Sequence, residues 1–530
     1  MTHDGQRVRR SVFIRKSVEQ VQREAVAQSL NRTLGPVHLV LLGVGAIVGS
    51  GIFVLTGTAA ANFAGPALML SFVFAGLACG FTGLCYAELA STMPACGSAY
   101  TYSYATLGEV FAWITGWLML LEYGVASSLV AVGFSGYAAS LLRDFGIVIP
   151  PALTTPFIDS VDTGGGVVFT AGHGFNLVAA LGVLAATALL LRGITTSAAA
   201  NSVMVFVKIT VLLIFVAVGV WWIDPANWTP FIPEHEGGFT YGWPGVFRAA
   251  SVIFFAYVGF ETVSTACAEA RNPQRDMPIG ILGALLACTV IYIAVAAVLI
   301  GVVPFRLLDV PDPIALAVDA IGMPLLAVVV KIGAVAGLCS VMLASMYGQT
   351  RVFYTMSNDG LLPRVFASVH ARFRTPFLGT IVLGVSMALA AGLLPISILA
   401  DIVSLGVSLS FGTVCVSVMW LRSTRPDLAR PFRVPLGGIR VGKVWIGVIP
   451  ALGVAFCILM AAPLVIDITV KAFAGNRIPA ILLLSYFAVG AVIYASYGFR
   501  HSQLSRAAMA GPTGSANAPT AMNLESGANS

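Results

Sequence analysis

The chain has few charged residues: only 10% of its 530 residues are Asp, Glu, Lys or Arg, against about 25% in an average soluble protein. Apolar residues make up 58% of it. Polar side chains are therefore too few to cover a surface that faces water. This composition excludes a soluble multidomain enzyme, a disordered chain and a nucleic-acid-binding protein. The sequence instead predicts an all-α polytopic membrane protein.

Patterns that hold metals or perform covalent chemistry are also missing. The eight cysteines lie inside or beside apolar runs and contain no C-x-x-C pair, so we interpret them as small helix-packing residues rather than as disulfides or metal ligands. Only His38 of the six histidines lies near an apolar run, and neither H-E-x-x-H nor G-x-S-x-G occurs. We expect no metal, no cofactor and no enzymatic activity.

Twelve apolar runs have about the length that a membrane-crossing helix requires. The fourth is short, and the third is long enough to tilt or to extend beyond the bilayer. The predicted spans are residues 37–62, 66–90, 107–141, 176–191, 197–222, 244–268, 278–303, 324–350, 376–394, 397–421, 443–466 and 478–499.

The basic residues give these spans an orientation. With a cytoplasmic N-terminus, 22 of the 29 Lys and Arg residues fall in cytoplasmic segments and 4 in outside loops, as the positive-inside rule requires. We therefore expect both termini in the cytoplasm, in a plasma membrane or bacterial inner membrane. The predicted divisions are a cytoplasmic N-terminal tail (1–36), a ten-helix core (37–421), a cytoplasmic loop with two peripheral helices (422–499) and a disordered C-terminal tail (500–530).

Glycines interrupt two of the spans. Gly49-Ser50-Gly51 lies near the middle of the first span, and Gly259 lies near the middle of the sixth. One interpretation is close helix packing, because Gly45 and Gly49 form a G-x-x-x-G step. The other is a pair of discontinuous helices in matching positions of a five-plus-five repeat, which in transporters indicates a binding site.

Broken helices would suit a zwitterionic ligand such as an α-amino acid. Free N–H groups at the start of the second half-helix would bind its carboxylate, and free carbonyls at the ends of the first halves would bind its amino group. The predicted carboxylate donors are Ser50, Gly51 and Ile52, and the predicted carbonyl acceptors are Ile47, Phe255 and Val258.

Six motifs in order along residues 30–420 resemble the amino acid–polyamine–organocation (APC) superfamily of permeases, and within it the cationic amino acid transporter-like branch. They are GVGAIVGSGIF (43–53), YAELASTMPACGSAYTYSYATLGE (86–109), GWLMLLEY (116–123), FFAYVGFETVST (254–265), EARNPQRDMPIGI (269–281) and YGQTRVFYTMSNDGLLP (347–363). The resemblance implies a LeuT-like core of two inverted five-helix repeats, two peripheral helices, and amino acid transport by alternating access. It also implies a cytoplasmic gate in the loops of the last two motifs.

Charges inside the spans are candidates for energy coupling. Lys208 lies about 16 Å into the fifth span, where a lysine needs a partner or a neutral form, and we interpret it as a proton carrier. Several proton-coupled members of the family resemble this chain in having a lysine there. Glu122 in span three is its predicted partner, the alternative being a structural glutamate. We expect Glu261 to be structural, at the start of a half-helix, and Lys331 to reach the outer surface.

The side-chain pocket is predicted from residues near the second break and on span eight: Tyr257, Phe260, Cys339, Met342 and Met346. Plain helix packing is the alternative for each of them. An aromatic and sulfur-containing lining slightly favours neutral amino acids over cationic ones. A proton-coupled permease is the preferred function. An exchanger or polyamine carrier on the same fold, or a sensor that binds without transport, remains open, as does the oligomeric state.

Overall fold

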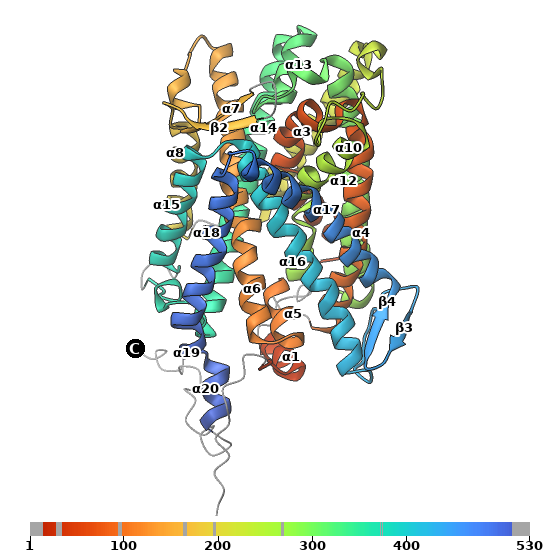
Figure 1. Cartoon of the computed structure of the whole chain (residues 1–530), viewed down its shortest axis with the longest axis vertical. Helices are drawn as coiled ribbons and strands as arrows, with labels where there is room; N and C mark the ends of the chain where they lie inside the picture. The colour runs from red at the N-terminus through yellow and green to blue at the C-terminus, as the bar shows by residue number, and fades with distance from the viewer. Residues whose placement is uncertain are drawn as a thin grey trace, which may run out of the picture.

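Long apolar helices run roughly along the longest axis of the molecule (Figure 1). The computed structural model describes residues 14–27, 34–93, 98–162, 167–193, 198–266, 270–370, 373 and 375–510. Residues 1–13 and 28–33 of the predicted N-terminal tail, residues 511–530 of the predicted C-terminal tail, and Cys96 and Cys267 lie outside this part of the chain.

Within the described ranges, nine helical stretches are long and apolar enough to cross a membrane: Gly51–Thr92, Glu109–Asp144, Val203–Trp222, Gly242–Ser264, Pro273–Val302, Pro324–Asn358, Ile396–Thr424, Val448–Phe473 and Ile478–Arg506. Three apolar helices are shorter: α2 (Pro36–Ile47), α8 (Leu177–Leu191) and α15 (Phe377–Leu393). The protein is thus mostly helical and multi-spanning, and every predicted span contains helix.

Several stretches are made of more than one element. The first comprises η1 (Gly51–Leu55), α3 (Thr56–Ala59), η2 (Ala60–Ala64), η3 (Gly65–Ala67) and α4 (Leu68–Thr92). The second comprises α6 (Glu109–Met119), the π-helical η4 (Leu120–Val125) and α7 (Ala126–Asp144). The other helices of the bundle are α9 (Ala198–Gly219), α10 (Gly242–Ile253), the six-residue α11 (Phe260–Thr265), α12 (Pro273–Val302), α14 (Pro324–Asn358), α16 (Ile396–Thr424), α17 (Val448–Phe473) and α18 (Ile478–Ile493).

Shorter helices and two hairpins cover the ends of the bundle. The helices are α1 (Val18–Ala27), α5 (Ser98–Thr106), α13 (Pro313–Ile321), α19 (Phe499–His501) and α20 (Gln503–Ala510). Helix α1 lies within the predicted N-terminal tail, and α20 lies within the tail that was expected to be disordered. Both lie at the same end of the molecule, and α13 lies at the other (Figure 1).

The all-α prediction missed two antiparallel hairpins, β1 (Ile158–Asp162) with β2 (Val167–Ala171) and β3 (Gly438–Val441) with β4 (Val444–Gly447). Residues 443–447 had been assigned to the eleventh span. They form a strand because β-branched residues alternate on both sides of a Gly442-Lys443 turn, and Gly442 has a φ of 60°, which glycine adopts readily in two-residue hairpin turns.

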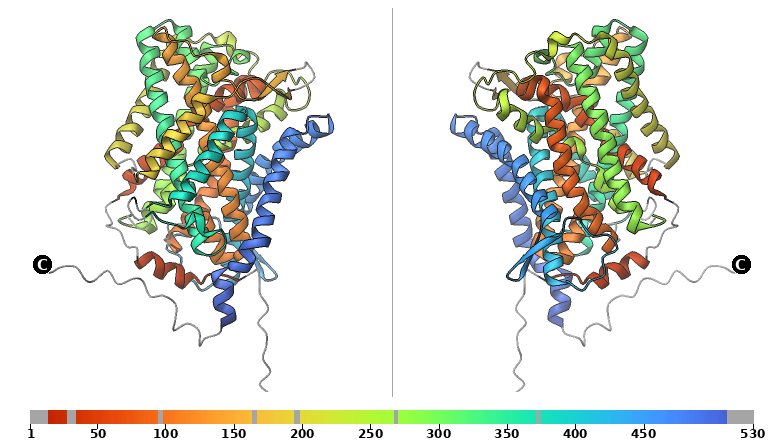
Figure 2. Two further views of the ribbon diagram at one scale, coloured as in Figure 1. Left: turned by 90° about the vertical axis from the view of Figure 1, so that its left-hand side faces the viewer. Right: turned by 90° about the vertical axis from the view of Figure 1, so that its right-hand side faces the viewer.

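The helices pack as an inner group with peripheral helices outside it. Helix α12 packs on α2 and α4, α14 on α7, and α15 on α8. Helix α17 packs on α16, and α17 and α18 lie on one outer side of the bundle (Figure 2). The interrupted segments 48–50 and 254–259 therefore lie inside the bundle, surrounded by other helices.

Candidate functional site

The first interruption lies directly after α2, which ends at Ile47. Val48 is extended, with a ψ of 101°, and the chain returns to helix in the π-helical turn η1. The Ile52 N–H, one of the three predicted carboxylate donors, donates to the Gly49 carbonyl at 3.2 Å. In this structure it therefore already has an acceptor. The buried Ser50 hydroxyl has no hydrogen-bond partner among the described residues.

The second interruption separates α10 from α11. A 3₁₀ turn, η8 (Phe254–Tyr257), follows α10, Val258 is extended with a ψ of 136°, and Gly259 has a φ of 123°. A side chain at this φ is strained, and a Cβ on Gly259 would lie 2.6 Å from the carbonyl carbon of Ala46. Glycine is therefore required for this break.

The two interrupted segments lie against each other. A Cβ on Gly51 would lie 2.3 Å from the Cα of Ala256. Between them, the Tyr292 hydroxyl of α12 is 3.0 Å from the carbonyl oxygens of both Ile47 and Ala256. Sequence reasoning missed Tyr292. A tyrosine within a predicted span was the one sequence feature that could have indicated it, because a buried tyrosine hydroxyl needs a hydrogen-bond partner.

Lys208 on α9 reaches the first interruption. Its ammonium group donates to the carbonyl of Gly45, and to that of Val48 at 2.8 Å. The side chain is fully buried, and a Cβ on Gly337 of α14 would lie 3.2 Å from the Cβ of Lys208. The carbonyls at the end of α2 have no continuing helix to bond, so they favour a positive charge there.

The predicted pairing of Lys208 with Glu122 is not present in this structure. Glu122 lies in the π-helical segment η4, is 1% exposed, and neither carboxylate oxygen has a hydrogen-bond partner among the described residues. Its charged and polar neighbours are Glu261 and Ser410. Lys208 instead bonds to backbone, because the end of α2 supplies two carbonyls at its depth.

Glu261 lies where sequence reasoning expected a structural role. Its carboxylate accepts the Gly259 N–H at 2.8 Å and the Tyr123 hydroxyl at 3.0 Å. The first contact stabilises the start of α11, where a carboxylate complements the helix N-terminus. Glu261 thus connects the second interruption to the π-helical segment that carries Glu122.

The predicted pocket residues near the second interruption contact different parts of the bundle. The Tyr257 hydroxyl donates to the Phe72 carbonyl at 2.8 Å. The ring of Phe260 packs in an aromatic cluster, 5.0 Å from Phe411. The carbonyl of Phe255, a predicted acceptor, already receives the Val258 N–H at 2.9 Å. Tyr257 and Phe260 therefore support the interruption in this structure.

On α14, a different residue from those predicted faces the first interruption. A Cβ on Gly49 would lie 3.1 Å from a methyl group of Val341. Met342 and Met346 are buried and Cys339 is half-buried. The side chain of Met342 lies toward α8, where a Cβ on Gly182 would be 3.9 Å from its methyl carbon. Successive residues of a helix point about 100° apart around its axis. The predicted residue, Met342, is one position after Val341 and therefore lies on a different side of α14.

Two further cations inside the spans have carboxylate partners. Arg248 on α10 is 1% exposed and lies 2.9 Å from both Asp401 and Asp467. Lys331 on α14 is fully buried and lies 2.8 Å from Asp144 and from Asp319. The prediction that Lys331 extends to the outer surface is therefore wrong, because its partners are on α7 and α13.

The end of the bundle that carries the predicted gate motifs is held by an ion pair. Lys16 lies 2.8 Å from Asp359, and the Tyr100 hydroxyl donates to the same carboxylate at 2.7 Å. The arginines of these motifs, Arg271, Arg275 and Arg351, form no ion pair among the described residues; Arg351 lies over the ring of Tyr347, 5.0 Å away.

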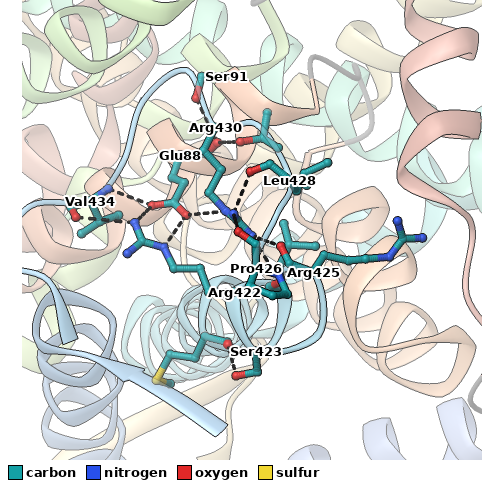
Figure 3. Close-up of polar contacts among 12 residues, drawn as sticks. Glu88, Ser91, Arg422, Ser423, Arg425, Pro426, Leu428, Arg430 and Val434 are labelled. Carbon is teal, nitrogen blue, oxygen red and sulfur yellow. Dashed lines mark hydrogen bonds and ion pairs between the residues drawn. The ribbon is translucent and has the colours of Figure 1, made fainter. Parts of the chain in front are cut away.

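A second polar cluster surrounds Glu88 of α4 (Figure 3). Its carboxylate accepts two N–H groups of Arg422, at the end of α16, and the Val434 N–H at 2.8 Å. Arg430 lies 3.6 Å from it and donates to the backbone carbonyls of the same loop. Burial lowers the pKa of Arg430 from its ordinary value. The cluster fixes the loop after α16 to the end of α4.

A sequence profile of the amino acid permease family matches residues 34–496, which include both interruptions, Lys208 and the Glu88 cluster. The chain belongs to this family. It is a transporter of the amino acid permease type, not an enzyme, and the resemblance to APC permeases is confirmed.

The relatives of this chain are named for different substrates. The methylthioribose transporter of Bacillus subtilis (strain 168) is 40% identical over 94% of this chain and 100% of its own length. The branched-chain amino acid permease BcaP of the same organism is 42% identical over 94% of this chain and 99% of its own. The vacuolar cationic amino acid transporter 2 of Arabidopsis thaliana is 38% identical over 79% of this chain and 64% of its own.

Proposed function

We propose that this permease takes up amino acids coupled to protons, by alternating access. In this proposal twelve helices span a plasma membrane or bacterial inner membrane with both termini in the cytoplasm. Residues 37–421 form a LeuT-like core of two inverted repeats, and residues 422–499 supply the loop and the peripheral helices. The observation that carries the proposal is the contact between the Lys208 ammonium and the Gly45 and Val48 carbonyls.

This contact connects a proton to the shape of the binding site. A charged ammonium holds the end of α2 more strongly than a neutral amine, because hydrogen bonds from charged donors are about twice as strong. Ile47, which lies between the two carbonyls in the sequence, is a proposed acceptor for the substrate amino group. Loss of the Lys208 proton therefore loosens the segment that carries the acceptor and favours substrate release.

The proposed substrates are neutral or cationic L-amino acids. The carboxylate would bind at the start of η1, at Ser50 and Gly51, and the amino group at Ile47 and Val258. A relative named for branched-chain amino acids matches the chain at 42% identity over 99% of its own length, and one named for cationic amino acids at 38% identity over 64% of its own length. The buried carboxylate of Glu122, which has no hydrogen-bond partner among the described residues, supports a cationic side chain or a proton as its partner, whereas Val341 suits an apolar side chain.

Uptake by proteoliposomes tests the function. A panel of labelled neutral and cationic amino acids, with polyamines included, is supplied with and without an inward proton gradient. We expect the gradient to increase uptake of at least one amino acid class. Uptake that needs internal amino acid but ignores the gradient would indicate an exchanger, and binding without uptake would indicate a sensor; either result would refute proton-coupled transport.

Replacing Lys208 tests the coupling residue. Lys208→Met removes the proton site, and we expect substrate binding to persist while the response of uptake to the gradient disappears. Arg477→Met is the control, because Arg477 is exposed between α17 and α18, forms no ion pair among the described residues, and its loss should leave the response unchanged. An unaltered gradient response in Lys208→Met would refute the assignment.

A further inference from the structure

The cytoplasmic hairpin β3–β4 has one face made entirely of apolar side chains. Its register places Ile439 opposite Ile446 and Val441 opposite Val444. Directly opposite residues, and residues two apart on a strand, project from the same face. The four side chains are 69%, 36%, 56% and 41% exposed in that order, so no described part of the chain covers this face.

The opposite face of the hairpin is turned toward the protein. Arg440 is paired with Trp445, and the guanidinium of Arg422 lies 4.2 Å from the Trp445 ring. The backbone N–H of Trp445 also donates to the Ser423 hydroxyl at 2.7 Å. These contacts hold the hairpin in one orientation, with Ile439, Val441, Val444 and Ile446 directed away from the bundle.

The apolar face continues into the surface that α17 presents to the bilayer. Helix α17 begins at Val448, one residue after β4, and Val448 and Ile458 are 45% and 62% exposed. The hairpin lies at the outer edge of the molecule, beside the lower end of α16 and below α17 (Figure 1). It is therefore placed at the boundary between bilayer and cytoplasm.

Two basic residues lie at the margins of the apolar face. Lys443 lies in the turn, Arg440 projects from the opposite face of β3, and both are exposed. Neither has an ion-pair partner among the described residues. A bare apolar face is unfavourable in water, whereas the headgroup region of a cytoplasmic leaflet offers apolar depth to that face and negative charge to the two cations.

We propose that the β3–β4 hairpin is a docking site for anionic phospholipids of the cytoplasmic leaflet. Ile439, Val441, Val444 and Ile446 enter the boundary between headgroups and acyl chains, and Arg440 and Lys443 bind lipid phosphate groups. The long stems of both basic residues allow their charged ends to remain at headgroup level. The inference rests on the orientation proposed above, with this loop in the cytoplasm.

The Glu88 cluster connects this site to the bundle. Val434, four residues before β3, donates to Glu88, which also accepts from Arg422 (Figure 3). The guanidinium of Arg422 also contacts the Trp445 ring. A lipid that holds the hairpin therefore also holds the loop that is bonded to the cytoplasmic end of α4. The transport rate should depend on anionic lipid through this connection.

The test places an environment-sensitive fluorophore on Val441→Cys in the full-length protein. Wild type carried through the same labelling gives the background from native cysteines. Nanodiscs contain phosphatidylcholine alone or with phosphatidylglycerol, and shallow spin-labelled lipids serve as quenchers. We expect a blue shift and stronger quenching with phosphatidylglycerol. Arg440→Gln and Lys443→Gln should each weaken the dependence on anionic lipid about fivefold, from about 1 kcal/mol per basic residue.

Arg433→Gln is the matched control, since Arg433 is an exposed arginine of the same loop outside the hairpin, and it should keep the full dependence. Identical, unquenched emission in both kinds of disc would overturn the proposal. So would shielding that occurs only when two copies share a disc, which would indicate an interface between copies. An impermeant quencher outside proteoliposomes tests the orientation separately, and none of these readouts depends on transport.

Discussion

Replacing Gly51 by alanine should open the contact between the two interrupted helices. The added Cβ would lie 2.3 Å from both the Cα and the Cβ of Ala256, whereas carbon atoms pack best about 3.5–4.0 Å apart. The two backbones must therefore separate by about 1 Å or more. Neither contacting atom belongs to a flexible side chain that could rotate away, so the substitution acts on the backbone itself.

Overpacking of this kind destabilises a structure by about 1–3 kcal/mol. That free energy lowers the population of the state with the interruptions in contact by about 5- to 150-fold, at 1.4 kcal/mol for each factor of ten. The measurements are the thermal unfolding midpoint in nanodiscs and the initial rate of uptake. We expect both to fall in Gly51→Ala.

Gly80→Ala supplies the control within the same helical stretch. A Cβ on Gly80 would meet nothing within 4 Å, and alanine is favoured over glycine in a helix by about 1 kcal/mol. Gly80→Ala should therefore keep or raise the unfolding midpoint and leave uptake unchanged. If Gly51→Ala behaves like Gly80→Ala, the two interruptions do not pack against each other as described, and the reasoning is refuted.

Three further substitutions give graded outcomes in the same unfolding assay. Arg248→Met leaves Asp401 without its ion-pair partner and Asp467 with Lys471 alone, and should destabilise the protein by about 3–5 kcal/mol; a loss below that of Lys331→Met would contradict this. Lys331→Met should destabilise it less, because the carboxylate partners of Lys331 are 26% and 44% exposed and water can solvate them. Tyr292→Phe leaves two carbonyls without their shared donor and should cost about 1–3 kcal/mol, with reduced uptake; unchanged stability and uptake would show that Tyr292 does not connect the interruptions.

The sequence predicted the positions of the interruptions because their cause is local. Gly259 is needed for a φ of 123°, and a Gly-Ser-Gly run weakens a helix wherever it occurs. The residues that contact the interruptions could not be predicted in this way. Tyr292 and Val341 lie on other helices, and which face of α12 or α14 is turned inward depends on packing that a uniformly apolar helix does not encode.

Charge partners were also beyond the sequence, for the same reason. Asp401 and Asp467 are 153 and 219 residues from Arg248, so depth along a span could not select them. The similar depths of Glu122 and Lys208 in their spans suggested that the two residues pair. A search for residues of opposite charge does not consider backbone carbonyls at a helix break, which are the groups that Lys208 contacts. The hairpin β3–β4 was missed because four-residue strands beside a span have the composition of the span itself.

Arg248, Lys331 and Lys208, the three cations inside the predicted spans, differ in whether loss of the positive charge leaves a carboxylate without a partner. Removal of the charge on Lys331 leaves Asp144 and Asp319 without their shared cation, and removal of the charge on Arg248 leaves Asp401 without one and Asp467 with Lys471 alone. A low-dielectric interior disfavours such carboxylates strongly. Lys208 has no carboxylate within hydrogen-bonding distance among the described residues; its bonds go to the Gly45 and Val48 carbonyls, which stay neutral. Its proton can therefore leave without stranding an anion. Of these three positions, Lys208 is therefore the one that best fits the proton site that we propose.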